Sequence, residues 1–112
     1  MYASDALMIF IETPVFTKRI KALISDDEYR RLQVSLTVNP KQGALLKNGS
    51  GIRKVRWRTG SHGKRGGVRV LYYYAESLRQ LRMLFVFGKN EQDNLTDEQL
   101  SQLRGIVERW SQ

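Results

Sequence analysis

Cationic side chains gather in the stretch from Arg53 to Tyr74, RKVRWRTGSHGKRGGVRVLYYY. It holds seven Lys or Arg residues, the only histidine of the chain and three consecutive tyrosines. Arg and Lys can stabilise the charge that builds on non-bridging phosphate oxygens when a ribose 2′-OH attacks the neighbouring phosphorus. Repulsion among cations also lowers the pKa of a lysine, so that a fraction of it can act as a general base. The stretch therefore permits RNA cleavage, although a basic sheet face with aromatic residues binds RNA without chemistry far more often.

Other routes to phosphate chemistry lack their residues here. Two-metal nucleases need carboxylates to hold divalent ions, and residues 41–90 contain only one, Glu76. A histidine pair is excluded because His62 is the only histidine, and the chain has no cysteine for a thiolate site or nucleophile. The run GSHGKRGG lacks the GK[ST] ending of a Walker loop. We therefore expect neither a metal nor another cofactor.

Charge is strongly segregated along the chain, whose net charge is +8. Residues 41–90 carry twelve positive side chains and one negative, whereas the remainder sums to −3. This pattern indicates a surface that binds a polyanion.

The N-terminus carries Asp5 and lacks the positive region of a signal peptide, and its apolar run from Leu7 to Ile11 is too short to span a bilayer. We expect a cytoplasmic protein.

Start and stop signals divide the chain into short elements. Thr13 and Ser25 fit helix N-caps, and Asn39-Pro40 ends the second helix, which predicts a helical hairpin. A capping box at Thr96 and Gln99 begins a C-terminal helix. The turn-rich segment 41–51 reads as a loop. Strands are expected at 7–12, 52–58, 68–74 and 81–87.

These elements predict an α+β fold in one domain, residues 1–112. Its antiparallel sheet consists of a three-strand meander plus the N-terminal strand, accompanied by the N-terminal helical hairpin and the C-terminal helix. We expect the helices to cover one face of the sheet and to leave the other face to the basic residues.

Strand alternation would bring several cations together on that face. Lys54, Arg56 and Arg58 alternate with Val55 and Trp57. If the strands adjoin, Arg69 on the next strand and Lys89 after the last strand join them. Tyr73 shares a face with Arg69 and could stack a base, whereas core packing is favoured for Tyr72 and Tyr74. The glycine loop carries His62, Lys64 and Arg65, and a histidine in such a loop fits a phosphate contact better than catalysis.

The motifs IRKVRW, GKRGGVRVLYYY and FVFGKNE, followed by a capped helix, resemble the RelE/HigB superfamily of toxins from bacterial type II toxin–antitoxin systems. The similarity is greatest to the HigB-like branch and covers nearly the whole chain. It implies a RelE-like fold and a ribosome-dependent endoribonuclease that cleaves mRNA in the 30S A site by metal-independent 2′-OH attack. It also implies a cognate antitoxin with a helix-turn-helix, through which alone operator DNA is contacted, and no membrane partner.

The resemblance also assigns individual residues. Lys54 and Arg56 match paired basic strand residues, Arg69 matches the arginine that contacts the scissile phosphate, and Lys89 belongs to the G-K motif. Asn90 stands where better-known relatives have an arginine, and no tyrosine follows Tyr74 to match their catalytic tyrosine. The general acid and base therefore stay unassigned. We predict catalytic roles for Lys54, Arg56, Lys64, Arg69 and Lys89, and RNA contacts from Arg58, His62, Arg65, Tyr73 and Asn90.

Two other functions fit the same basic face. The first is a non-catalytic RNA- or ribosome-binding module, which predicts salt-sensitive binding with intact RNA. The second, a DNA-binding protein, is weaker because the basic residues lie on strands and a loop, with no helix suited to the major groove.

Overall fold

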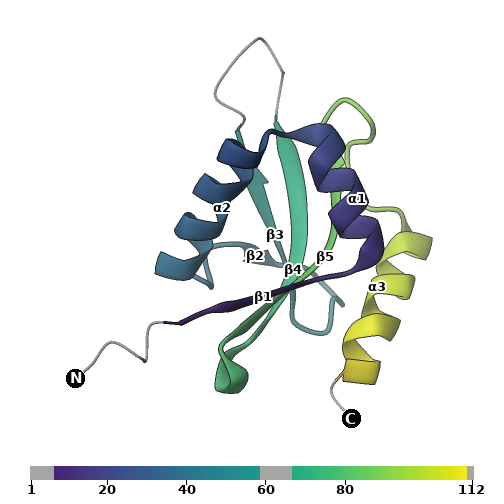
Figure 1. Cartoon of the computed structure of the whole chain (residues 1–112). Helices are drawn as coiled ribbons and strands as arrows, with labels where there is room; N and C mark the ends of the chain where they lie inside the picture. The colour runs from purple at the N-terminus through teal and green to yellow at the C-terminus, as the bar shows by residue number, and fades with distance from the viewer. Residues whose placement is uncertain (1–6, 59–66, 111–112) are drawn as a thin grey trace.

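A five-stranded mixed sheet forms the centre of the molecule, in the strand order β1-β5-β4-β3-β2 (Figure 1). The computed structural model describes residues 7–58 and 67–110. The predicted α+β fold is confirmed, and strands β3, β4 and β5 form the expected antiparallel meander. The strands are β1 (Ile9–Glu12), β2 (Ala44–Leu45), β3 (Ile52–Trp57), β4 (Val68–Ala75) and β5 (Gln80–Gly88).

Both edges of the sheet differ from the prediction. The N-terminal strand β1 pairs with β5 in parallel, so the sheet is not purely antiparallel. At the other edge, the segment 41–51 was expected to be a loop but contains β2, which pairs antiparallel with β3. A strand of two residues is too short to produce an alternating pattern, which is why composition alone marks it as a turn.

The helix starts follow their capping signals. The Thr13 hydroxyl accepts a hydrogen bond from the Phe16 N–H at 3.1 Å, and the Ser25 hydroxyl accepts one from the Glu28 N–H at the same distance. These caps satisfy backbone donors that the first turn leaves without a helical partner. They begin α1 (Pro14–Leu23) and α2 (Asp26–Val38), and the Thr96–Gln99 capping box begins α3 (Asp97–Trp110).

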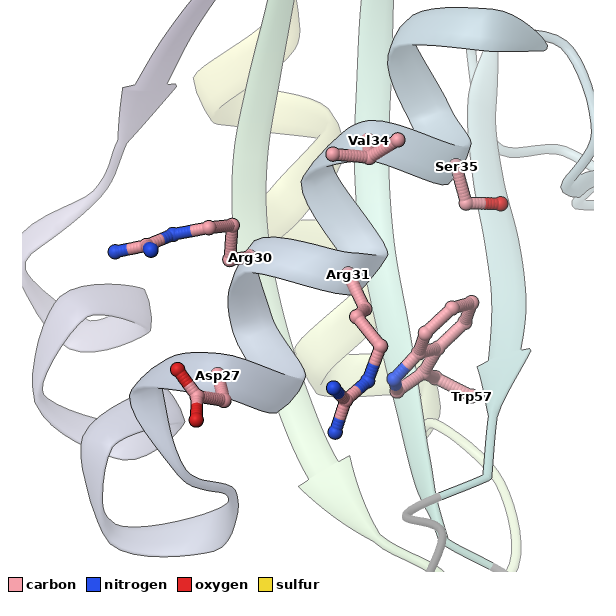
Figure 2. Close-up of a pocket in the computed structure, with 6 residues that line it drawn as sticks. All are labelled: Asp27, Arg30, Arg31, Val34, Ser35 and Trp57. Carbon is pink, nitrogen blue, oxygen red and sulfur yellow. The ribbon is translucent and has the colours of Figure 1, made fainter.

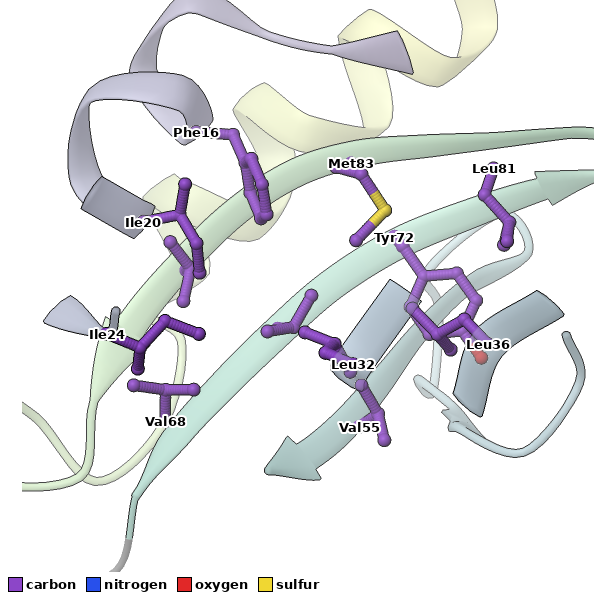
Figure 3. Close-up of a cluster of buried hydrophobic side chains, with 12 residues drawn as sticks. Phe16, Ile20, Ile24, Leu32, Leu36, Val55, Val68, Tyr72, Leu81 and Met83 are labelled. Atoms are coloured by element: carbon purple, nitrogen blue, oxygen red, sulfur yellow. The ribbon is translucent and has the colours of Figure 1, made fainter. Parts of the chain in front are cut away.

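Apolar cores lie on both faces of the sheet. One face packs against α1 and α2, with Tyr72 and Met83 among its fully buried side chains (Figure 3). The other face packs against α3 through residues such as Leu71 and Phe87. The expectation that the helices cover one face is therefore wrong. The cause lies in β4 and β5, whose nearly continuous apolar runs bury side chains in both directions.

A β-bulge adjusts β5 to the second core. Leu71 pairs with Phe85 and Tyr72 with Met83, which leaves Leu84 as an extra residue in β5. An extra residue bends a strand and shifts its later side chains by one position. Leu84 and Phe87 are both fully buried in the core beneath α3 as a result.

No helix within residues 7–58 and 67–110 combines the length and apolar character needed to cross a bilayer.

Candidate functional site

The pairing of β3 with β4 concentrates positive charge on the sheet face beneath α3. Lys54 and Arg56 follow Ile52 at two-residue steps, and Ile52 belongs to the α3-side core. Arg56 is directly opposite Arg69 in the strand register. Like charges directly opposite each other destabilise a sheet, so this pairing costs stability that a functional site would explain.

Lys54 lies within electrostatic reach of three other cations. Burial lowers the pKa of its amine, and the charges of Arg56, Arg69 and Lys89 lower it further. These four residues, Lys54, Arg56, Arg69 and Lys89, are called the cation cluster below. Lys54 and Arg56 lie on β3, Arg69 lies on the neighbouring strand β4, and Lys89 directly follows β5. The sequence predicted this grouping from the alternation of side chains along the strands and from the G-K motif after the last strand.

Arg69 is the most enclosed member of the cation cluster, with 7% of its surface exposed. Burial lowers the pKa of its guanidinium, and the charge of Arg56 adds to the effect. An anion that binds beside these two groups would offset both the repulsion and part of the lost hydration. Position and charge therefore make Arg69 suited to a phosphate group.

Lys89 is held by its backbone and by a neighbouring carboxylate. Its N–H donates to the Gly67 carbonyl at 3.1 Å, which ties the end of β5 to the start of β4. Its Nζ lies 3.0 Å from Asp93 Oδ1, four residues further on. The hydrogen bond from Lys89 and the charge of its amine lower the pKa of Asp93. Sequence reasoning missed Asp93, although the i,i+4 spacing after Lys89 was visible.

Of the remaining predicted site residues, Arg58, Tyr73 and Asn90 lie within the described part of the chain. Arg58 is exposed at the end of β3, and Asn90 is exposed in the turn after β5. Tyr73 shares the face of Arg69 but is half-buried against the α3-side core, so its role as a stacking platform stays a prediction. Tyr72 is fully buried, as the core assignment requires. His62, Lys64 and Arg65 lie outside the described residues.

Residues 7–58 and 67–110 contain no group of three His, Cys, Asp or Glu side chains arranged to hold a metal ion. What the cation cluster can do is neutralise a phosphate and the charge that develops on it. Within the cation cluster, Lys54 is the group whose lowered pKa suits it to take a proton.

A groove opens on the side of the sheet opposite the cation cluster, between α2 and β3 (Figure 2). Its volume is about 500 Å³. The indole Nε1 of Trp57 is buried beside it and has no hydrogen-bond partner among residues 7–58 and 67–110. Because Trp57 and Arg56 are adjacent on one strand, they point to opposite faces. The groove is therefore separate from the cation cluster. Its lining residues are Asp27, Arg30, Arg31, Val34, Ser35 and Trp57.

Comparison with known proteins identifies the fold. No protein-family model matches the sequence. A variant of the E. coli toxin RelE with two arginines replaced by alanine, solved in the free state, is similar with a TM-score of 0.63 and 14% identity over 89% of this chain and 97% of that one. A chain of the intact E. coli RelBE toxin–antitoxin complex is similar with a TM-score of 0.56 and 15% identity over 73% of this chain and 96% of that one. The chain therefore has the fold of the RelE toxin.

Proposed function

We propose that this protein is the toxin of a type II toxin–antitoxin pair, of the HigB-like branch, and acts in the cytoplasm as a ribosome-dependent mRNA endoribonuclease. The observation that supports this most is the cation cluster, in which Arg56 and Arg69 face each other on a RelE fold. Sheet stability alone disfavours two arginines directly opposite each other, and a phosphate that both neutralise would account for the arrangement. An antitoxin would neutralise the protein, as the likeness to a RelBE chain suggests.

The proposed reaction is attack of the ribose 2′-oxygen on the adjacent phosphorus in the A-site codon. The 2′-O–P bond forms as the P–O5′ bond breaks, and the departing 5′-oxygen takes a proton from water, which leaves a 2′,3′-cyclic phosphate on one fragment and a 5′-hydroxyl on the other. Arg69 and Arg56 stabilise the charge on the non-bridging oxygens. Lys54 takes the 2′ proton, because its lowered pKa raises its neutral fraction. Lys89 completes the positive surroundings of the phosphate, and Lys64, which lies outside the described residues, keeps its predicted catalytic role.

Expression without an antitoxin tests the function directly. We expect growth and translation to stop, and primer extension on mRNA from translating ribosomes to show breaks at fixed positions within codons. Lys89→Ala and Lys64→Ala are each expected to relieve the growth arrest. Salt-sensitive ribosome binding with intact mRNA would instead identify a non-catalytic binding module. Normal growth with abundant soluble protein would contradict the toxin assignment.

The acid–base chemistry predicts an unusual titration of Lys54. Nuclear magnetic resonance of the lysine Cε groups is expected to show Lys54 losing its proton below the usual lysine pKa of 10.5, because burial and three nearby cations disfavour its charged form. Arg56→Gln should raise this pKa, since it removes one of those cations.

Cleavage should follow the same titration. The neutral fraction of Lys54 grows as pH rises toward its lowered pKa, so single-turnover cleavage should increase with pH. Arg56→Gln should move that increase to higher pH. Arg30→Gln, which removes the same charge from the exposed surface of α2, should leave the titration unchanged. If Lys54 titrates with the other lysines, it is not the general base.

The Lys89–Asp93 ion pair competes with RNA for Lys89. Asp93→Asn is expected to strengthen binding of a non-cleavable RNA only slightly, because an ion pair as exposed as Lys89–Asp93 is weak. The gain should shrink as salt is added. Fluorescence titrations measure the binding. Asp26→Asn, at the start of α2, removes the same single negative charge as Asp93→Asn and serves as the control. Equal gains from both variants would show that only net charge matters.

A further inference from the structure

A small pocket opens beside the cation cluster, between the segment after β2 and the start of α3. Its volume is about 160 Å³. Lys54 belongs to both the pocket and the cation cluster, so a group bound in the pocket lies next to the site of the phosphate. The pocket is lined by Leu46, Lys47, Lys54, Asn94, Leu95 and Leu100.

The pocket has apolar walls from two separate parts of the chain. Leu46 directly follows β2, and its N–H donates to the Ile52 carbonyl at 2.9 Å, which fixes it against β3. Leu95 and Leu100 lie on either side of the α3 N-cap Thr96, at the spacing of a hydrophobic staple, and both pack against the α3-side core. All three leucines are half-buried. Because the helix cap and the β2–β3 ladder hold these walls, the pocket is largely pre-formed.

The polar lining of the pocket consists of two lysines and one amide. None of its lining residues is acidic, so the lining carries a net positive charge. Asn94 is exposed, and its side-chain amide makes no hydrogen bond within the described part of the chain. The amide offers one acceptor oxygen and two N–H donors. It can therefore form a bidentate pair with a group that presents a donor next to an acceptor.

Size and chemistry together define the ligand. The volume is far below the roughly 300–1,000 Å³ of pockets that take drug-sized molecules, so a single ring system fits. A nucleobase has apolar faces, which can pack between leucines, and an edge of alternating donors and acceptors, which an amide can pair. The phosphate of the same nucleotide would extend toward Lys54.

We propose that this pocket binds one nucleobase of the RNA strand whose phosphate lies on the cation cluster, and that Asn94 pairs with the edge of that base. The proposal rests on the proposed function, because it places the base and the reacting phosphate in one RNA strand. Asn94 is then a specificity-determining residue, and the pocket supplies a base contact that does not depend on Tyr73.

Cleavage of mRNA with randomised A-site codons tests the specificity. Wild-type protein on programmed ribosomes should prefer some bases at one codon position. Asn94→Ala should reduce that preference about tenfold, within the range of one lost bidentate pair. Asn39→Ala, which truncates an exposed asparagine at the end of α2, should keep the preference. An unaltered preference in Asn94→Ala would overturn the proposal.

Direct binding separates failure of the pocket from failure of the proposed function. Nucleoside monophosphates should shift the methyl resonances of Leu46, Leu95 and Leu100 saturably in the full chain, whereas inorganic phosphate should not. Asn94→Leu, which fills the pocket, should abolish these shifts while the other methyl resonances stay dispersed. Absent shifts in wild-type protein would exclude the pocket even if mRNA is cleaved. Shifts without any cleavage would retain the base site and reject the nuclease.

Discussion

Arg69→Ala is expected to lower single-turnover mRNA cleavage by about 10²–10³-fold, the usual effect of removing one group that stabilises transition-state charge. Cells that express the variant should grow without an antitoxin. The effect should be large because Arg69 is the enclosed member of the cation cluster, with 7% of its surface exposed, and it faces Arg56 across the strand pair. Quench-flow cleavage on programmed ribosomes and growth curves provide the measurements.

Two further variants define what Arg69 contributes. Arg69→Lys should recover part of the activity, because it keeps the charge but loses the planar pair of donors that matches phosphate oxygens. Arg30→Ala, on the exposed surface of α2, should cleave like wild type. Thermal unfolding of each variant shows whether the fold survives. A folded Arg69→Ala protein with full toxicity would refute the proposed site.

The second large effect concerns Gly67, at the boundary between the glycine loop and β4. Gly67→Ala is expected to lower the free energy of unfolding by about 2–5 kcal/mol, from backbone strain and overpacking. Gly67 has a φ of +61°, and a Cβ there would lie 2.1 Å from the Trp57 carbonyl oxygen. Since the Gly67 carbonyl also accepts the Lys89 N–H, the distortion should reach the cation cluster and reduce cleavage.

Gly105 provides a matched control, because alanine at this position should change the free energy of unfolding in the opposite direction. It lies within α3, and a Cβ at this position meets only the side chain of Arg109, at 3.4 Å. Gly105→Ala should raise the free energy of unfolding by about 0.5–1 kcal/mol, because alanine is the better helix former. Chemical denaturation measures both variants. A Gly67→Ala protein as stable as wild type would contradict the close approach of Gly67 to Trp57.

Local features of the fold were predictable because their signals are local. Thr13, Ser25 and Thr96 each cap a helix through a hydrogen bond to a residue three positions away. Alternation likewise predicted that Lys54 and Arg56 share a face. Such features depend on neighbouring residues and on the geometry of a single helix or strand.

Features that depend on distant partners were not predictable from local patterns. The parallel pairing of β1 and the two-residue strand β2 each require another strand to define them. The second core beneath α3 was missed because a continuous apolar run in β4 fits one-sided or two-sided burial equally well. The pocket beside the cation cluster was missed for the same reason, since Leu46 and Leu95 are far apart in sequence and line one pocket only in the folded chain.

The pairing of β1 with β5 has a consequence for synthesis of the protein. The Thr13 hydroxyl donates to the Leu84 carbonyl at 2.8 Å, across 71 residues of sequence. At about 5–20 residues per second, the ribosome needs several seconds to make the partner that β1 requires. The growing chain therefore cannot complete its sheet, or place Lys89 beside Lys54, until nearly all of it has been translated. Under the proposed nuclease function, late closure of the sheet would keep an unfinished chain from cleaving the message that encodes it.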